Sequence, residues 1–108
     1  MENKKQVSTT LKVSTGVVKR AVKELEMYRQ EVDEGENKLK TMPTNDNFYS
    51  QTQKALEESR TVLSRTEERL KTALADLESK MKGVSQDNED LADASTWTER
   101  AKAIISTN

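Results

Sequence analysis

Two pairs of adjacent carboxylates, Glu57-Glu58 and Glu67-Glu68, are the residues of this sequence that come nearest to catalytic chemistry. General acid and base catalysis needs such groups in a pocket that separates their pKa values. A helical bundle with heptad layers offers no such pocket, and Glu67 stands four residues before Lys71, the spacing of a supportive helix pair. We interpret both pairs as solvated side chains and expect no enzyme activity.

Metal and nucleotide sites lack their usual residues. The sequence has no cysteine and no histidine, which excludes disulfides, thiolate chemistry, imidazole bases and ordinary zinc sites. The run Asp87-Asn88-Glu89-Asp90 lacks the alternation and the glycine of a calcium loop. Ser14-Thr15-Gly16 before Lys19-Arg20 lacks the Gly-Lys-Ser/Thr end of a phosphate loop. We expect no cofactor or metal, and interpret Gly16 as a residue that lets two helices approach.

The middle of the chain, from Asn45 to Gly83, carries the strongest structural signal. An apolar row recurs at every seventh residue, at Tyr49, Leu56, Leu63, Leu70, Leu77 and Val84. A period of seven is typical of a helix that presents one seam to partner helices. Uninterrupted by glycine or proline, this helix measures roughly 58 Å at 1.5 Å per residue. The flanking segments must cover its seam.

Both flanking segments repeat the pattern. Rows at Leu11, Val18, Leu25, Val32 and Leu39 and at Leu91, Thr98 and Ile105 predict a first and a third helix. Met42-Pro43 ends the first helix, and Gly83 is a candidate C-cap for the second. The sequence predicts one domain over residues 1–108, with helices at about 7–41, 45–83 and 86–106.

Short connections make neighbouring helices antiparallel. We therefore predict an all-α fold, an elongated antiparallel three-helix bundle with left-handed, coiled-coil-like packing and a shorter third helix. Three-way layers are expected at Leu11/Leu77/Leu91, Val18/Leu70/Thr98 and Leu25/Leu63/Ile105. The pairs Val32/Leu56 and Leu39/Tyr49 lack a third partner, so the far end of the hairpin should be a two-helix arm.

Composition and charge fit such a bundle. Hydrophobic residues make up 32 % and charged residues 34 % of the 108, and the formal net charge is −1. Six basic residues stand against one acid before Glu24, whereas five acids stand against two bases after Gly83. The acidic last segment is therefore expected beside the basic start. No apolar run approaches the ~20 residues of a membrane span, and the first five residues form no secretory signal.

Partner surfaces are harder to assign. Lys19, Arg20 and Lys23 could bind phosphates, yet no aromatic residues interleave them and an acidic block follows, so nucleic acid is disfavoured. Trp97 flanks the third seam and is interpreted mainly as packing. Phe48 and Tyr49, on the uncovered arm, are candidates for a partner surface.

A family resemblance covers nearly the whole chain. The run Thr15-Gly16-Val17-Val18-Lys19-Arg20-Ala21-Val22-Lys23-Glu24, followed by Met27-Tyr28, resembles the first helix of tubulin-folding cofactor A, the tubulin-specific chaperone A family. Glu58-Ser59-Arg60, Arg69-Leu70 and Asp76-Leu77 are similar to its middle helix, and Asp90-Leu91 with Ala94 and Trp97 to its third. Some members carry a proline where this chain has Ser64, so a client-binding face that depends on a bend there would be shifted.

The resemblance implies a monomeric or dimeric bundle that captures quasi-native β-tubulin after its release from the cytosolic chaperonin and passes it on toward the α/β-tubulin heterodimer, alongside other tubulin-folding cofactors. Binding would use helix surfaces without ATP or metal, in the cytoplasm and in association with the cytoskeleton. Arg60, in the second similar block, joins the candidate partner-binding residues. We expect Lys19, Arg20 and Lys23 to steer an acidic client and to raise its association rate.

Two other functions remain open from the sequence. A structural spacer of the spectrin-repeat type shares this size and topology, but such repeats usually carry their tryptophan in the first helix and continue into a further repeat. A membrane-surface amphipathic helix is disfavoured by the mean hydropathy of −0.92.

Overall fold

The structure, a computed structural model, describes residues 4–107, with side-chain surroundings from Thr9 to Thr107. It contains three helices, α1 over Lys4–Thr41, α2 over Tyr49–Met81 and α3 over Glu89–Ser106. The Cα atoms extend over 65 × 20 × 15 Å, with a radius of gyration of 18.7 Å. A compact domain of this length would have a radius of gyration near ~13 Å, so the chain forms a rod.

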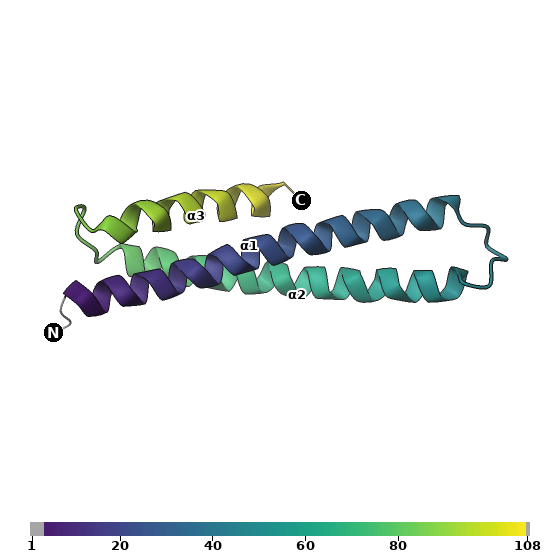
Figure 1. Cartoon of the computed structure of the whole chain (residues 1–108), viewed down its shortest axis with the longest axis horizontal. Coiled ribbons are helices and arrows are strands. Elements are labelled where there is room, and N and C mark those ends of the chain that lie inside the picture. The colour runs from purple at the N-terminus through teal and green to yellow at the C-terminus, as the bar shows by residue number, and fades with distance from the viewer. Residues whose placement is uncertain (1–3, 108) are drawn as a thin grey trace.

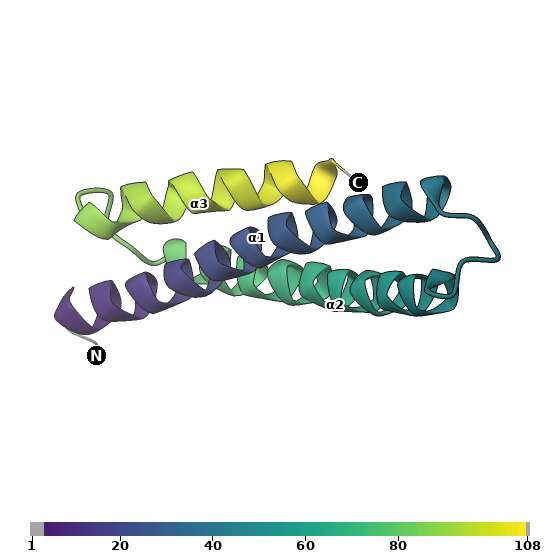
Figure 2. The same cartoon turned by 45° about the vertical axis from the view of Figure 1, so that its right-hand side comes forward.

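The three helices are antiparallel in sequence order (Figure 1). α1 and α2 form a long hairpin, and α3 lies along the half that holds the start of α1 and the end of α2 (Figures 1 and 2). With 18 residues against 38 and 33, α3 leaves the turn end of the hairpin as a two-helix arm. The predicted all-α three-helix bundle with a shorter third helix is confirmed.

Several helix ends differ from the sequence expectation. α2 begins only at Tyr49 because residues 43–48 form turns, in which the Phe48 backbone N–H donates to Asp46 Oδ1 at 2.8 Å. Gly83 does not act as a left-handed C-cap, since α2 already ends at Met81 and no described glycine has a positive φ. α3 begins at Glu89 because the side chain of Asn88 accepts the Asp90 N–H and caps the helix.

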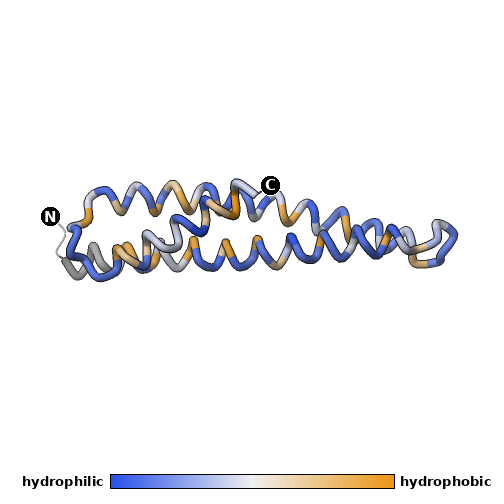
Figure 3. The backbone as a smooth tube through the Cα atoms, turned by 90° about the horizontal axis from the view of Figure 1, so that it is seen from above, coloured by the Kyte–Doolittle hydropathy of each residue, from blue (hydrophilic) through white to orange (hydrophobic). Residues whose placement is uncertain are grey.

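The core lies where all three helices overlap. Leu11, Val18, Leu25, Leu70 and Leu77 are fully buried, and Ala94, Trp97, Thr98 and Ala101 of α3 cover them. Leu63 and Ile105 are half-buried against this cluster, and Leu91, Val32, Leu39 and Tyr49 are also half-buried. Figure 3 shows hydrophobic residues alternating with hydrophilic ones along each helix, as one-sided burial requires. Leu56, although on the arm, is only 4 % exposed.

Gly35 explains why Leu56 is buried there. A Cβ atom at Gly35 would lie 3.0 Å from Leu56 Cδ1, so the missing side chain lets α1 approach the leucine closely. Gly16, for which we expected such a role, has none: a Cβ there would meet only Arg20 Nη1, at 3.9 Å. The close approach therefore occurs on the arm and not at the bundle end.

The contacts that fix the register of α3 lie nearer the C-terminal end of α2 than the expected layers. The Thr98 hydroxyl donates to Met81 Sδ at 3.4 Å, and Lys102 pairs with Glu78 at 3.8 Å. Met81 stands eleven residues after Leu70, the residue predicted opposite Thr98, so the two side chains meet about three helical turns nearer the α2–α3 connection than the prediction placed them. The predicted layers paired residues at equal distances from the turn and so omitted this displacement.

Opposite charges meet along α1 and α3, as the charge distribution led us to expect. Lys12 Nζ lies 3.9 Å from Asp90 Oδ1. The side chains of Lys4 and Lys5, which contribute to the basic start, lie outside the described residues.

A polar cluster joins α1 to α2 inside the three-helix section. The buried Ser14 hydroxyl donates to Asp76 Oδ2 at 3.2 Å and accepts from Lys80 Nζ at 2.8 Å, while Lys80 also contacts Asp76 at 3.0 Å. The hydrogen bonds from Lys80 and Ser14 together hold the pKa of Asp76 below its usual value, against a smaller opposing effect of burial.

Replacing Asp76 by asparagine should weaken the fold at neutral pH only. Because the pKa of Asp76 is lowered in the folded chain, its carboxylate stabilises the folded state at pH values above the pKa of the unfolded chain. This stabilisation is lost as the pH falls through the pKa of the folded chain. Because Asp76 is half-exposed, we expect a loss of about 0.2–1 kcal/mol in urea unfolding at pH 7 that vanishes between about pH 5 and pH 2. Glu58→Gln, at an exposed position, is the control; a gap that persists in acid would contradict the prediction.

Candidate functional site

Three of the four carboxylates first considered for catalysis lie on open surfaces. Glu57 and Glu58 are exposed on α2, and Glu68 is exposed beside Lys71, with 3.6 Å between Glu68 Oε1 and Lys71 Nζ. Glu67 instead faces α1 and pairs with Arg29. Within residues 4–107 no group of three or more acidic side chains is placed to hold a metal ion.

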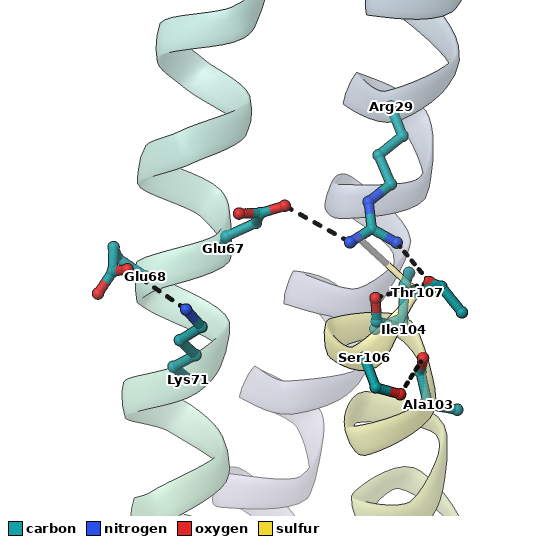
Figure 4. Close-up of polar contacts among 8 residues, drawn as sticks. All are labelled: Arg29, Glu67, Glu68, Lys71, Ala103, Ile104, Ser106 and Thr107. Carbon is teal, nitrogen blue, oxygen red and sulfur yellow. Dashed lines mark hydrogen bonds and ion pairs between the residues drawn. The ribbon is translucent and has the colours of Figure 1, made fainter.

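Ion pairs mark the place where α3 ends. Arg29 Nη2 lies 3.4 Å from Glu67 Oε1, and Arg29 Nη1 donates to Thr107 Oγ1 at 3.1 Å, just beyond the last residue of α3 (Figure 4). One heptad further along the arm, Glu36 pairs with Arg60 at 3.1 Å. These four charged residues continue the rows that are formed beneath α3 by Thr15, Val22, Leu74 and Met81.

The side of the hairpin on which α3 packs changes from uncharged to charged residues where the arm begins, and this change makes the groove between α1 and α2 on the arm unfavourable for a further helix. Over two heptads, the uncharged side chains named above pack beneath α3. Over the next two heptads, on the arm, the same rows hold the ion pairs. Burying a paired charge under a helix costs desolvation free energy that its Coulomb attraction often fails to recover. The α3-side groove of the arm is therefore poorly suited to an apolar partner.

Two cations lie over the ring of Trp97. Lys19 Nζ lies 5.5 Å and the Arg100 guanidinium carbon 4.7 Å from its ring centroid, and the ring itself is only 8 % exposed. Such cation–π contacts stabilise the packing of the cation against the ring. Lys19, a candidate partner-binding residue, therefore contributes to the attachment of α3 to α1.

The other candidate partner-binding residues are distributed over distant places. Arg60 is committed to Glu36 across the hairpin, while Tyr49 is half-buried at the start of α2. Phe48 is 64 % exposed at the turn end of the arm. The turn is thus the one part of the arm where a large apolar group is offered to solvent among the described side chains.

Arg20 and Lys23 lie on the solvent face of α1 together with two residues that the sequence reasoning missed. Val13 is 61 % and Met27 47 % exposed. Both stand seven residues from Arg20, which places the three on one side of the helix. Their spacing could have indicated a second apolar row on α1, but the seam rows alone were counted.

No helix of the described chain is long and apolar enough to cross a membrane.

Comparison with known proteins agrees with this geometry. The family model for tubulin binding cofactor A matches residues 6–105. Tubulin-specific chaperone A of Oryctolagus cuniculus and that of Homo sapiens are each 35 % identical to this chain over 92 residues, covering 82 % of both sequences. A crystal structure of tubulin folding cofactor A from Arabidopsis thaliana superposes with a TM-score of 0.81 at 29 % identity, covering 91 % of this chain and 97 % of that one.

The rod of three helices therefore defines a class of helical binding proteins. Within that class, this chain belongs to the tubulin binding cofactor A family. In this chain α2 runs unbroken from Tyr49 through Ser64 to Met81.

Proposed function

We propose that this protein is a tubulin-folding chaperone that captures quasi-native β-tubulin after its release from the chaperonin and hands it on toward the α/β heterodimer. The observation that carries the proposal is the family match over residues 6–105, together with a rod whose candidate partner-binding residues lie on helix surfaces, apart from Phe48 in the turn before α2. A protein of this kind acts by holding its client, so it needs contact area and no reaction centre.

Passive binding is sufficient for such a role. A protein that binds one conformer of its client stabilises that conformer by RT ln(1 + [L]/Kd), which is about 2.7 kcal/mol at a hundredfold excess over Kd. This stabilisation free energy depends only on binding and needs no nucleotide hydrolysis. Binding therefore proceeds without ATP, and we place the protein in the cytoplasm with the tubulin pool and the cytoskeleton.

The exposed cations set the rate of encounter. Arg20 and Lys23 are exposed, and within the described chain neither forms an ion pair, whereas Lys19 is held over Trp97. Long-range attraction of an acidic client by such charges raises the association rate more than the final affinity. The association rate is thus expected to fall as ionic strength rises.

The test is retention of β-tubulin from cell extract on the immobilised protein at low salt, before and after enzymatic removal of ATP. We expect β-tubulin without its α partner, in equal amounts under both conditions. Retention of the intact α/β heterodimer, or of neither subunit, would refute the proposal. A helical spacer, the alternative from the sequence, would retain neither.

A further inference from the structure

One face of α1 is covered by neither of the other helices. It carries Val13, Gly16, Arg20, Lys23 and Met27, separated by alternating steps of three and four residues, and we call these five the basic-apolar stripe. Val13 and Met27, at its ends, are two of the large hydrophobic residues that the described chain exposes. Steps of three and four are the spacing at which one helix presents a continuous seam to another.

The charges within the stripe have no ion-pair partner among the residues that the structure describes. Lys12 and Arg29, also on α1, reach carboxylates of other helices. Within residues 9–107, Arg20 and Lys23 reach none, and the stripe itself contains no acid. The stripe is therefore complementary to a negatively charged surface.

Gly16 supplies the second argument. The other helical glycine in the described chain, Gly35, admits the side chain of Leu56 from a neighbouring helix. At Gly16 the space above the backbone is open apart from Arg20 Nη1 at 3.9 Å. A glycine inside a helix is destabilising relative to alanine, and no other helix of the described chain packs into the space at this one. It leaves a notch between Val13 and Arg20 in the exposed stripe.

We propose that the basic-apolar stripe binds an amphipathic helix of the tubulin client, one that carries carboxylates beside an apolar row. The carboxylates pair with Arg20 and Lys23, the apolar row covers Val13 and Met27, and a large side chain enters the notch at Gly16. From Val13 to Met27 the stripe spans about 21 Å at 1.5 Å per residue, enough for four turns of a partner helix. This inference rests on the proposed function and assigns its binding face.

The first test fills the notch. Gly16→Gln should leave the melting temperature at or above that of the unchanged protein, because a Cβ atom at this position would meet only Arg20 of the same helix and glutamine favours helix. The amount of β-tubulin retained from extract should fall at least tenfold. Ser64→Gln, at an exposed position of α2, is the matched control and should change neither quantity.

The second test reverses the charges. The double variant Arg20→Glu/Lys23→Glu should also lose at least tenfold in retained β-tubulin. Lys54→Glu/Arg65→Glu makes the same change of charge on an exposed face of α2, where neither residue forms an ion pair in the described chain, and should retain β-tubulin normally.

The outcomes separate this proposal from the one on which it rests. If the unchanged protein retains no β-tubulin, the proposed function fails. If it retains β-tubulin and both stripe variants do so equally well, the stripe is not the binding face and this inference alone is overturned. It is also overturned if the unchanged protein sediments as a dimer that the stripe variants dissolve, or if it binds anionic vesicles through the stripe while β-tubulin retention is unaffected.

Discussion

Replacing Leu70 by alanine should cost more stability than any other leucine truncation, about 2–5 kcal/mol of unfolding free energy. Leu70 is fully buried in the section where all three helices meet, and it belongs to the same cluster as Val18. The loss combines the transfer of its side chain to water with a cavity that the rigid helices on three sides cannot close.

Urea unfolding followed by circular dichroism measures this loss, and each kcal/mol should also lower the melting temperature by about 4–8 °C. Leu39→Ala is the control, since Leu39 is half-buried on the two-helix arm. If Leu39→Ala were as damaging as Leu70→Ala, the main source of stability would lie in the arm and our description of the core would be wrong.

Replacing Trp97 by alanine should release α3 before it disturbs the hairpin. Truncation of a buried tryptophan costs about 3–5 kcal/mol, and the other buried residues of α3 are the small Ala94, Thr98 and Ala101. The variant also removes the ring on which Lys19 and Arg100 rest. The other polar contacts of α3 with α1 described above, Lys12–Asp90 and Arg29–Thr107, lie at its two ends.

Hydrogen exchange resolved along the chain measures this release. Amides of residues 89–106 should lose protection far more than those of 56–77, because local opening exposes only the detached element. Thr96→Ala, at an exposed position of the same helix, should leave the protection pattern unchanged. Equal loss in all three helices would show that α3 and the hairpin unfold as one unit.

The hairpin could be predicted from the sequence because apolar side chains at regular spacing form the seam between its two helices. Large apolar residues at every seventh position of both long helices, leucine or valine except for Tyr49, can be buried only if the helices pack along one another. The short third row likewise predicted where α3 would be absent. These features follow from periodicity, which needs no knowledge of distances.

The roles of the glycines could not be predicted in this way. Gly16, Gly35 and Gly83 look alike in the sequence, yet one faces solvent, one admits Leu56 and one lies beyond a helix that has already ended. Their effects depend on how near a neighbouring atom comes and on the backbone φ. Both are tertiary quantities.

The candidate site was predicted only in part for a similar reason. Arg20 and Lys23 were found by their charge, but Lys19, beside them in the sequence, rests on Trp97 of a helix far along the chain. Val13 and Met27 were overlooked because a valine or methionine gives no sign of being exposed until the covering helices are placed. Their exposure is what extends the charge cluster into the face that we propose for the client.

The ion pairs Arg29–Glu67 and Glu36–Arg60 also determine where α3 can dock. If α3 slid one heptad toward the turn, its apolar side chains would cover Arg29 and Glu67 and strip water from both charges. A slide the other way would uncover Val22 and Leu74, which are now buried. The hairpin therefore allows a single register of α3. A variant with uncharged residues at positions 29 and 67 would allow α3 to pack in two registers.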